Sequence, residues 1–145
     1  MIHDVVVTPL KQIPDERGKV MHMLRSDAPG FAGFGEIYFS CVNAGAVKAW
    51  RRHRRLVSNY AVPLGRIRLA LYDARPDSQT NGEVQELVIG EDHYCLVTIP
   101  PGIWTGFQGL GSTMSIVANC ASLPHDPAES ERCDPFANDI PFKWD

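Results

Sequence analysis

The sequence predicts an all-β fold, either a sandwich or a barrel. Two observations support this prediction: no segment keeps a helical repeat of apolar residues over about ten positions, and about eight short apolar or alternating stretches are separated by turn residues. The 12 glycines and 11 prolines are scattered along the chain, as expected for many short strands joined by turns. At 145 residues the chain is expected to form a single domain, residues 1–145, with a core of its own.

The expected strands are the stretches in which apolar residues alternate or in which β-branched and aromatic residues dominate. The clearest is 66–73, where Ile67, Leu69 and Leu71 alternate with residues of the opposite face. The other expected strands are 5–7, 20–24, 36–42, 84–89, 94–99 and 115–120. Turns or loops are expected at 13–18, 27–35, 76–82 and 100–102, and a short helical turn near 128–132.

Composition narrows the class of function. The net charge of −3 argues against general affinity for nucleic acid, because the basic residues are concentrated in one short run. No apolar run reaches the length of a membrane span, and the first residues lack the basic and apolar layout of a signal peptide. The four cysteines form no close pair, which favours free thiols in a cytoplasmic protein over a disulfide or metal framework.

The most basic part of the chain is 45–65, which reads GAVKAWRRHRRLVSNYAVPLG and contains one histidine, His53. If this stretch forms one strand, the period of two places Arg51, His53 and Arg55 on the same face. Two permanent cations beside a base that titrates near neutrality suit a small anionic ligand from which a proton is moved. The alternative is a solvated basic edge that discourages pairing with strands of other molecules.

The spacing of this stretch resembles the first cupin motif, G-x5-H-x-H-x(3,4)-E-x6-G. The matching positions are Gly45, Arg51, His53, Ser58 and Gly65. The later part of the second motif, G-x5-P-x-G-x2-H, is similar to Pro100, Gly102 and Thr105. The resemblance implies a double-stranded β-helix (cupin) jelly roll. Of the four metal-ligand positions only one keeps a ligand, His53, so no metal is expected, because a lone imidazole beside guanidinium groups holds a divalent ion poorly.

A narrower resemblance covers most of the chain. Five segments, in the same order, are similar to motifs of the dTDP-4-dehydrorhamnose 3,5-epimerase family. They are DERG at 15–18, VKAWR at 47–51, DAR at 73–75, IPPGIWTGF at 99–107, and DP at 134–135 followed by Ile140 and Trp144. Members of this family are metal-free cupins that act on 4-keto sugar nucleotides and pair through their sheets. The resemblance therefore implies a cofactor-free protein that binds a sugar nucleotide and forms a homodimer.

The resemblance also implies catalytic roles. The family's catalytic histidine falls at Arg51, and the aspartate that orients it falls at Asp134. The related sugar-nucleotide 3,4-ketoisomerases resemble R-G-x-H-x-H at this strand, where His53 takes the second histidine position. His53 is therefore expected to be the base, with Asp134 as its orienting partner. Arg51 or Lys48 is expected to stabilise the enolate, although Lys48 has the opposite parity and reaches the pocket only across a β-bulge.

The acid that returns the proton remains open. The family's catalytic tyrosine falls near 117–118, where this chain has none, and the candidates are Tyr38, Tyr60 and His125, each of which also fits a packing or loop role. The residues expected to contact the substrate are Arg17, Lys48, Tyr60, Arg75, Asn119 and His125. Arg17 suits a pyrophosphate, because guanidinium matches phosphate oxygens, or it pairs with Asp15 in a turn.

The expected function is the epimerisation or keto-isomerisation of a 4-keto-6-deoxy sugar nucleotide, dTDP-linked or linked to another nucleoside diphosphate, for polysaccharide or glycoconjugate synthesis. The main alternative is a cupin that binds a sugar nucleotide but has lost its acid and base. A third reading is a nucleic-acid-binding β protein that uses the basic stretch, which predicts an exposed basic surface and binding that weakens steeply with salt.

Overall fold

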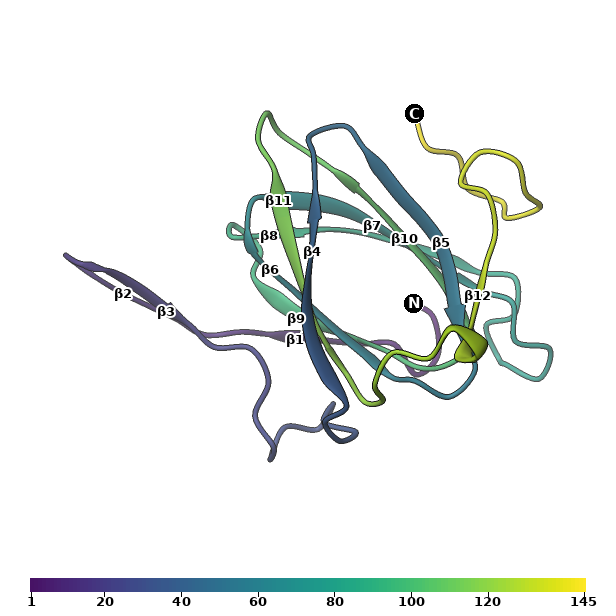
Figure 1. The fold of residues 1–145 in the computed structure, drawn as a ribbon, viewed down its shortest axis with the longest axis horizontal. Coiled ribbons are helices and arrows are strands. Elements are labelled where there is room, and N and C mark those ends of the chain that lie inside the picture. The colour runs from purple at the N-terminus through teal and green to yellow at the C-terminus, as the bar shows by residue number, and fades with distance from the viewer.

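Two five-stranded antiparallel sheets face each other, and a two-stranded hairpin projects from them (Figure 1). The computed structural model describes residues 1–145. One sheet has the order β1-β9-β6-β11-β4 and the other β12-β5-β10-β7-β8. The elements are β1 Val6–Pro9, β2 Gln12–Asp15, β3 Gly18–Met21, β4 Glu36–Val42, β5 Val47–His53, β6 Ser58–Leu64, β7 Arg66–Asp73, β8 Val84–Gly90, β9 Cys95–Ile99, β10 Ile103–Gly109, β11 Ser115–Ala121, η1 Pro127–Glu129 and β12 Ser130–Arg132. The all-β cupin jelly roll expected from the sequence is confirmed.

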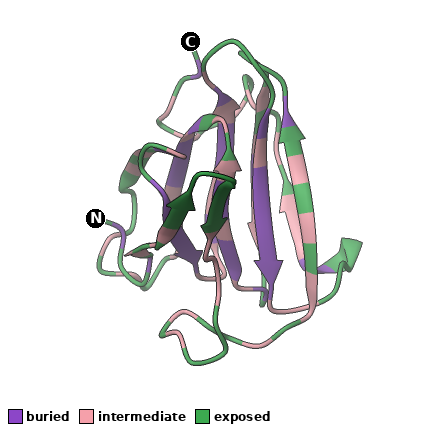
Figure 2. Cartoon of the chain, turned by 90° about the vertical axis from the view of Figure 1, so that its left-hand side faces the viewer, coloured by how far each residue is buried: buried purple, intermediate pink, exposed green.

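Strand β7 shows how the sequence pattern builds the core. Its alternate residues Ile67, Leu69 and Leu71 have no exposed surface, and they belong to the apolar cluster between the sheets that also contains Val97 and Val117. Burying a side chain of this size contributes about 1.5–3 kcal/mol. The burial pattern of Figure 2 follows this arrangement, with buried residues along the strands of the two sheets.

The basic stretch forms two strands, not one. Strand β5 ends at His53, and β6 begins at Ser58 in the opposite sheet. The turn between them is held by the Glu129 carboxylate, which accepts hydrogen bonds from the backbone N–H groups of Arg55 and Leu56. Arg55 therefore lies outside the strand that carries Arg51 and His53, and the prediction of a shared face for all three is wrong.

The outer face of the second sheet is covered by the C-terminal segment. Trp144 packs on Trp50 with ring centroids 5.3 Å apart, and Phe142 packs edge-on against Trp144 at 4.7 Å. The segment reaches this face after β12 has paired with β5, as the yellow end of the ribbon shows in Figure 1. The last residues of the chain thus fix the position of β5, the strand that carries the basic residues.

Strands β2, β10 and β12 were not predicted, and β2 overlaps the stretch 13–18 that was expected to be a turn. In β10, Gly106 and Gly109 interrupt the apolar alternation, yet Gly106 is required because a Cβ there would overlap Ala49 of β5 and the Trp144 ring. Strand β12 has the sequence SER, which has no strand preference by itself, and it forms by pairing with Arg51, Arg52 and His53 of β5. A helical turn was expected here, and only the three-residue η1 takes that form.

The β2–β3 hairpin extends away from the sandwich and is exposed along most of its length (Figures 1 and 2). Even its apolar residues Ile13 and Val20 are 43% and 58% exposed. Arg17 lies at its turn, where Nη2 is 2.8 Å from Oδ2 of Asp15. A projecting hairpin whose apolar side chains Ile13 and Val20 are left uncovered is suited to contact with another molecule.

Candidate active site

A cavity of about 500 Å³ lies between the two sheets, within the size range of small-molecule sites. Its polar and charged lining comes from six strands. These residues are Tyr38, Ser40, Cys41, Lys48, Arg51, Tyr60, Thr105, Asn119 and Arg132. Phe107 and Val117, which also belong to the core, provide apolar surface. The lining contains three cationic side chains and no carboxylate or imidazole, so the cavity favours an anionic ligand.

The three cations reach the cavity by different routes. Arg51 faces it directly from β5. Lys48 has the opposite parity, but β5 carries a bulge: Thr105 pairs with Arg51 and Phe107 pairs with Lys48, so three steps along β5 match two along β10. This is the irregularity that the sequence required for Lys48 to enter, and its Nζ donates to Ser40 Oγ at 3.1 Å.

Arg132 is the third cation, and no pattern in the sequence predicts its place in the cavity. It is brought to the cavity by β12, where it pairs with Arg51 of β5. Strand β12 forms only through this pairing. Neither periodicity nor motif spacing in the sequence therefore identifies the Arg132 side chain as part of a site. Arg132 is exposed, so it lies at the mouth of the cavity, whereas Arg51 is half-buried.

A chain of buried amides supports the opposite wall. Asn119, which is 2% exposed, donates through Nδ2 to the hydroxyl oxygen of Tyr38 at 3.0 Å. Its Oδ1 accepts the backbone N–H of Asn59 at 3.1 Å. The Asn59 side chain in turn accepts from the Thr98 hydroxyl and donates to the carbonyl of Gly30. The Tyr38 hydroxyl is therefore attached to a hydrogen-bonded network that fixes its position.

Tyr60 also lines the cavity, but its environment differs. Its hydroxyl has no hydrogen-bond partner within the protein, and its ring stands edge-on to Phe107 with centroids 6.2 Å apart. Burial, with a smaller contribution from Tyr38, raises the pKa of Tyr60. This phenol holds its proton more firmly than a solvated tyrosine does.

His53 does not line this cavity, and the prediction that it shares one with Arg51 is wrong. It lies instead at a second, smaller depression of about 250 Å³ beside Arg52, Arg54 and Arg75. Its Nδ1 donates to Glu129 Oε1 at 2.7 Å. Strand β5 ends at His53, and the Glu129 carboxylate that holds the following turn also holds the imidazole. Parity along the strand was therefore not enough to place this side chain.

Glu129, the partner of His53, was not predicted from the sequence. Its side chain is only 3% exposed, and burial by itself would raise its pKa. The hydrogen bonds from Arg55 N–H, Leu56 N–H and His53 outweigh burial and hold the pKa of Glu129 below its usual range. A glutamate in the polar run HDPAESER carries no pattern that identifies it as buried.

Asp134 does not orient His53, contrary to prediction. Its Oδ1 accepts the backbone N–H groups of Phe136 and Ala137 in a turn of the C-terminal segment. His125 lies on an exposed loop, where its backbone N–H donates to Glu36. These two residues, together with Arg17 on the hairpin, lie outside the cavity of their own chain.

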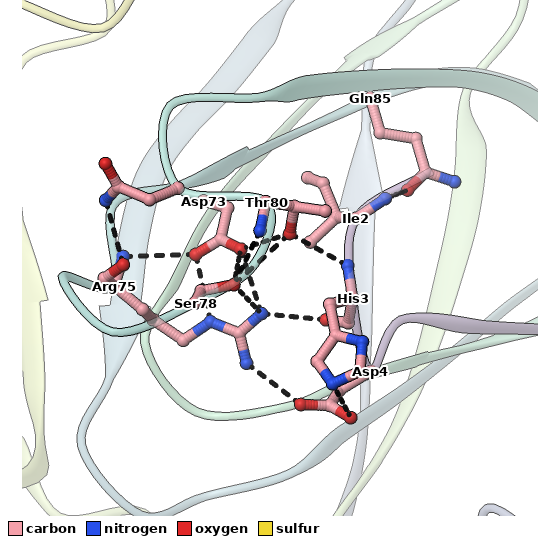
Figure 3. A network of polar contacts seen from close by, with 9 residues as sticks. Ile2, His3, Asp4, Asp73, Arg75, Ser78, Thr80 and Gln85 are labelled. Carbon is pink, nitrogen blue, oxygen red and sulfur yellow. Dashed lines mark hydrogen bonds and ion pairs between the residues drawn. The ribbon is translucent and has the colours of Figure 1, made fainter.

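Arg75 is part of a structural network rather than the cavity wall (Figure 3). Its guanidinium donates to both oxygens of Asp73, and further donors to Asp73 Oδ2 are the hydroxyls of Ser78 and Thr80, each at 2.6 Å. Burial alone would raise the pKa of Asp73, but these hydrogen bonds hold it well below its usual range. Arg75 also binds Asp4 and so ties the N-terminal segment to the loop after β7.

The chain contains no cluster of three or more histidine, cysteine, aspartate or glutamate side chains that could hold a metal ion. Helices are nearly absent, and none has the length and apolar character needed to span a membrane. The polar groups that line the cavity are amine, guanidinium, phenol, hydroxyl, thiol and amide groups.

Comparison with known proteins identifies relatives along the whole chain. The family model described as dTDP-4-dehydrorhamnose 3,5-epimerase matches residues 1–145. The "probable low-salt glycan biosynthesis epimerase Agl13" of Haloferax volcanii is 36% identical over 127 residues, covering 86% of this chain and 81% of that protein. The "spore coat polysaccharide biosynthesis protein SpsL" of Bacillus subtilis is 31% identical over 146 residues, covering 99% and 97%. A crystal structure of a "dTDP sugar isomerase" from Desulfovibrio desulfuricans G20 superposes with a TM-score of 0.96 at 46% identity, covering 99% and 92%.

Proposed function

The chain belongs to the dTDP-4-dehydrorhamnose 3,5-epimerase family, and from this membership we propose that it epimerises or keto-isomerises a 4-keto-6-deoxy sugar nucleotide for glycan or polysaccharide synthesis. The observation that carries the proposal is the convergence of Lys48, Arg51 and Arg132 on one cavity of about 500 Å³. A sugar nucleotide needs cationic partners at its pyrophosphate and, during reaction, at the enolate oxygen.

The two guanidinium groups divide between these two tasks by their depth in the cavity. Arg132, exposed at the mouth, suits the pyrophosphate, whose oxygens match a guanidinium fork. Arg51 is half-buried in the cavity and would meet the oxygen on which negative charge develops. Preorganised donors at such an oxygen contribute about a hundred- to a thousandfold in rate.

The base must be found among the groups that line the cavity. His53 lies outside it, and no carboxylate lines it, so we assign the role of base to the Lys48 amine. The hydrogen bond to Ser40 holds Nζ between β5 and β4, where it can reach a carbon next to the ketone. Removing a positioned base costs a factor of about 10² to 10⁴ in rate.

A homodimer completes the proposal. Ile37 and Phe39 of β4 are 52% and 66% exposed, and Phe39 also borders the cavity that Tyr38 and Ser40 line. A second copy packed on this sheet would cover them. Since the hairpin carries Arg17 away from its own sandwich, this residue would bind substrate only in the partner's cavity. We place the reaction in the cytoplasm, with the proposed sugar-nucleotide substrate.

The test is solvent exchange. A dTDP-4-keto-6-deoxyhexose is incubated with the protein in D2O, and deuterium at the carbons next to the ketone is followed by NMR. We expect exchange by the unmodified protein, a loss of at least about a hundredfold in Lys48→Met and in Arg51→Met, and retained exchange in His53→Gln. Binding of the sugar nucleotide with no exchange in the unmodified protein would instead establish the binding-only alternative. Loss of exchange in His53→Gln with normal affinity would return the role of base to His53.

A further inference from the structure

We infer that Tyr38 is the acid that protonates the substrate carbon, and that Asn119 is the positioning residue that directs its proton; this inference rests on the proposed function. The family's tyrosine position near 117–118 is occupied by Val117 and Ala118 in this chain. Tyr38 lies on β4, the strand next to β11, where it pairs directly with Asn119. A phenol is therefore present in the cavity, supplied by the neighbouring strand.

The direction of the Tyr38 proton follows from the hydrogen bonds of Asn119. The backbone N–H of Asn59 can only donate, so the atom of Asn119 that faces it must be the amide oxygen. The amide nitrogen is then the atom that faces Tyr38, and it can only donate to the phenol oxygen. Because this oxygen accepts from Asn119, the phenol hydrogen remains free to point to a ligand in the cavity.

The other two candidates for the acid lack this arrangement. Tyr60 lines the cavity, but no group of the protein donates to its oxygen, and it is packed against Phe107. The imidazole of His125 belongs to an exposed loop outside the cavity. Of the three residues that the sequence left open, only Tyr38 combines access to the cavity with a fixed hydrogen bond to its oxygen.

The position of Tyr38 relative to the base suits a reaction at one carbon. Lys48 Nζ is held by Ser40, which lies two residues after Tyr38 on the same face of β4. Alternate residues of a strand are about 7 Å apart along the backbone, so Ser40, which holds the amine, and Tyr38 are neighbours on one wall of the cavity. A base and an acid on opposite sides of a carbon produce inversion of its configuration.

The proposed step conserves atoms and charge. Lys48 removes the proton from the carbon, the electron pair of that C–H bond becomes the C=C bond of the enolate, and the carbonyl pair moves to the oxygen beside Arg51. Tyr38 then gives its O–H proton to the carbon, the enolate oxygen re-forms the C=O bond, and the C=C pair forms the new C–H bond. The ammonium of Lys48 and the phenolate of Tyr38 return to their starting forms by proton exchange with water.

The experiment compares two rates on the same substrate, deuterium exchange in D2O and inversion of configuration. In Tyr38→Phe we expect exchange within about tenfold of the unmodified protein, because the base and the enolate site are intact, and inversion reduced by at least about a hundredfold. Tyr72→Phe is the matched control, since Tyr72 lies on β7 outside the cavity, and both rates should be unchanged.

Asn119→Asp tests the positioning role through its pH dependence. An ionised carboxylate at this position accepts from Asn59 N–H and also accepts the phenol hydrogen, so inversion should fall relative to exchange. Protonation of the introduced carboxyl at lower pH restores a donor toward Tyr38, and the ratio of inversion to exchange should recover. Tyr38→Phe should show no recovery at any pH.

The outcomes separate this inference from the proposed function. Equal inversion in Tyr38→Phe and in the unmodified protein overturns the role of Tyr38 and leaves the proposed function standing. A ratio in Asn119→Asp that does not change with pH overturns the positioning role of Asn119. Absence of exchange in the unmodified protein overturns the proposed function and the inference together.

Discussion

Replacement of Asp73 by asparagine tests the network that holds the N-terminal segment to the loop after β7. The carboxylate is fully buried and accepts hydrogen bonds from the Arg75 guanidinium and from the hydroxyls of Ser78 and Thr80. An asparagine amide presents a donor to one of these groups and removes the charge that neutralises Arg75. Breaking a buried ion pair in this way lowers the free energy of unfolding by about 3–5 kcal/mol. We expect the lower value, about 3 kcal/mol, because Arg75 still forms its ion pair with Asp4.

This loss corresponds to a decrease in Tm of about 6–12 °C for a chain of this size, measured by calorimetry or circular dichroism at pH 7. Asp4→Asn is the matched control, because Asp4 also pairs with Arg75, at 3.2 Å, but is more than half exposed. We expect it to lower the free energy of unfolding by less than about 1 kcal/mol. Equal effects of the two substitutions would refute the assignment of this network to the Asp73 carboxylate.

The pH dependence provides a second measure. The pKa of Asp73 is lower in the folded than in the unfolded state, so its stabilising contribution is complete above the unfolded pKa of about 3.9 and is lost as the pH falls toward the folded pKa. The difference in stability between the parent and Asp73→Asn should therefore be constant from pH 7 to pH 5 and then decrease by up to about 1.4 kcal/mol per pH unit. A difference that is the same at pH 7 and pH 3 would contradict this.

Three further predictions concern the cavity mouth, the proposed dimer and the C-terminal cover. Arg132→Ala should weaken dTDP binding by about tenfold in calorimetric titration, whereas Arg25→Ala, an exposed arginine paired with Asp27, should not change it. Ile37→Asp should convert the dimer to a monomer in analytical ultracentrifugation, and an equally exposed site on the other sheet, changed in Val88→Asp, should leave it intact. Trp144→Ala should lower the free energy of unfolding by about 3–5 kcal/mol in urea denaturation, and a loss below 1 kcal/mol would show that the C-terminal segment does not cover β5 in solution.

The sequence predicts the sheets of this protein better than its site. Alternation identified β7 with its observed bounds because a strand buried on one face must repeat with a period of two. Glycine and proline identified turns because their effect on the backbone depends only on the residue itself and its neighbours in the sequence. Strands β10 and β12 were not predicted because neither has local strand character. In β10, position 106 must be glycine because a Cβ would overlap Ala49. Strand β12 forms only because it pairs with the edge of β5.

The cavity residues divide in the same way. Arg51 was predicted by parity, and Lys48 was predicted on the condition of a bulge that the structure contains. His53 has the same parity as Arg51, but the strand ends at His53, and Glu129, 76 positions later in the sequence, binds its imidazole. Arg132 comes from a segment whose placement depends wholly on tertiary pairing. The period of a strand can be recognised in a single sequence, but the tertiary contact between His53, the last residue of β5, and Glu129 cannot.

The position of β12 and the C-terminal segment makes the complete cavity depend on residues near the end of the sequence. Residues 130–144 supply one of its three cations and the cover over the outer side of β5, and they follow all the other strands in the chain. Until they dock, β5 has a free edge and Trp50 has no aromatic partner, so a partly folded or nascent chain would have two sheets but no complete anion site. Ligand affinity would therefore report the docking of these residues as well as the formation of the sheets, and a ligand would stabilise the docked state.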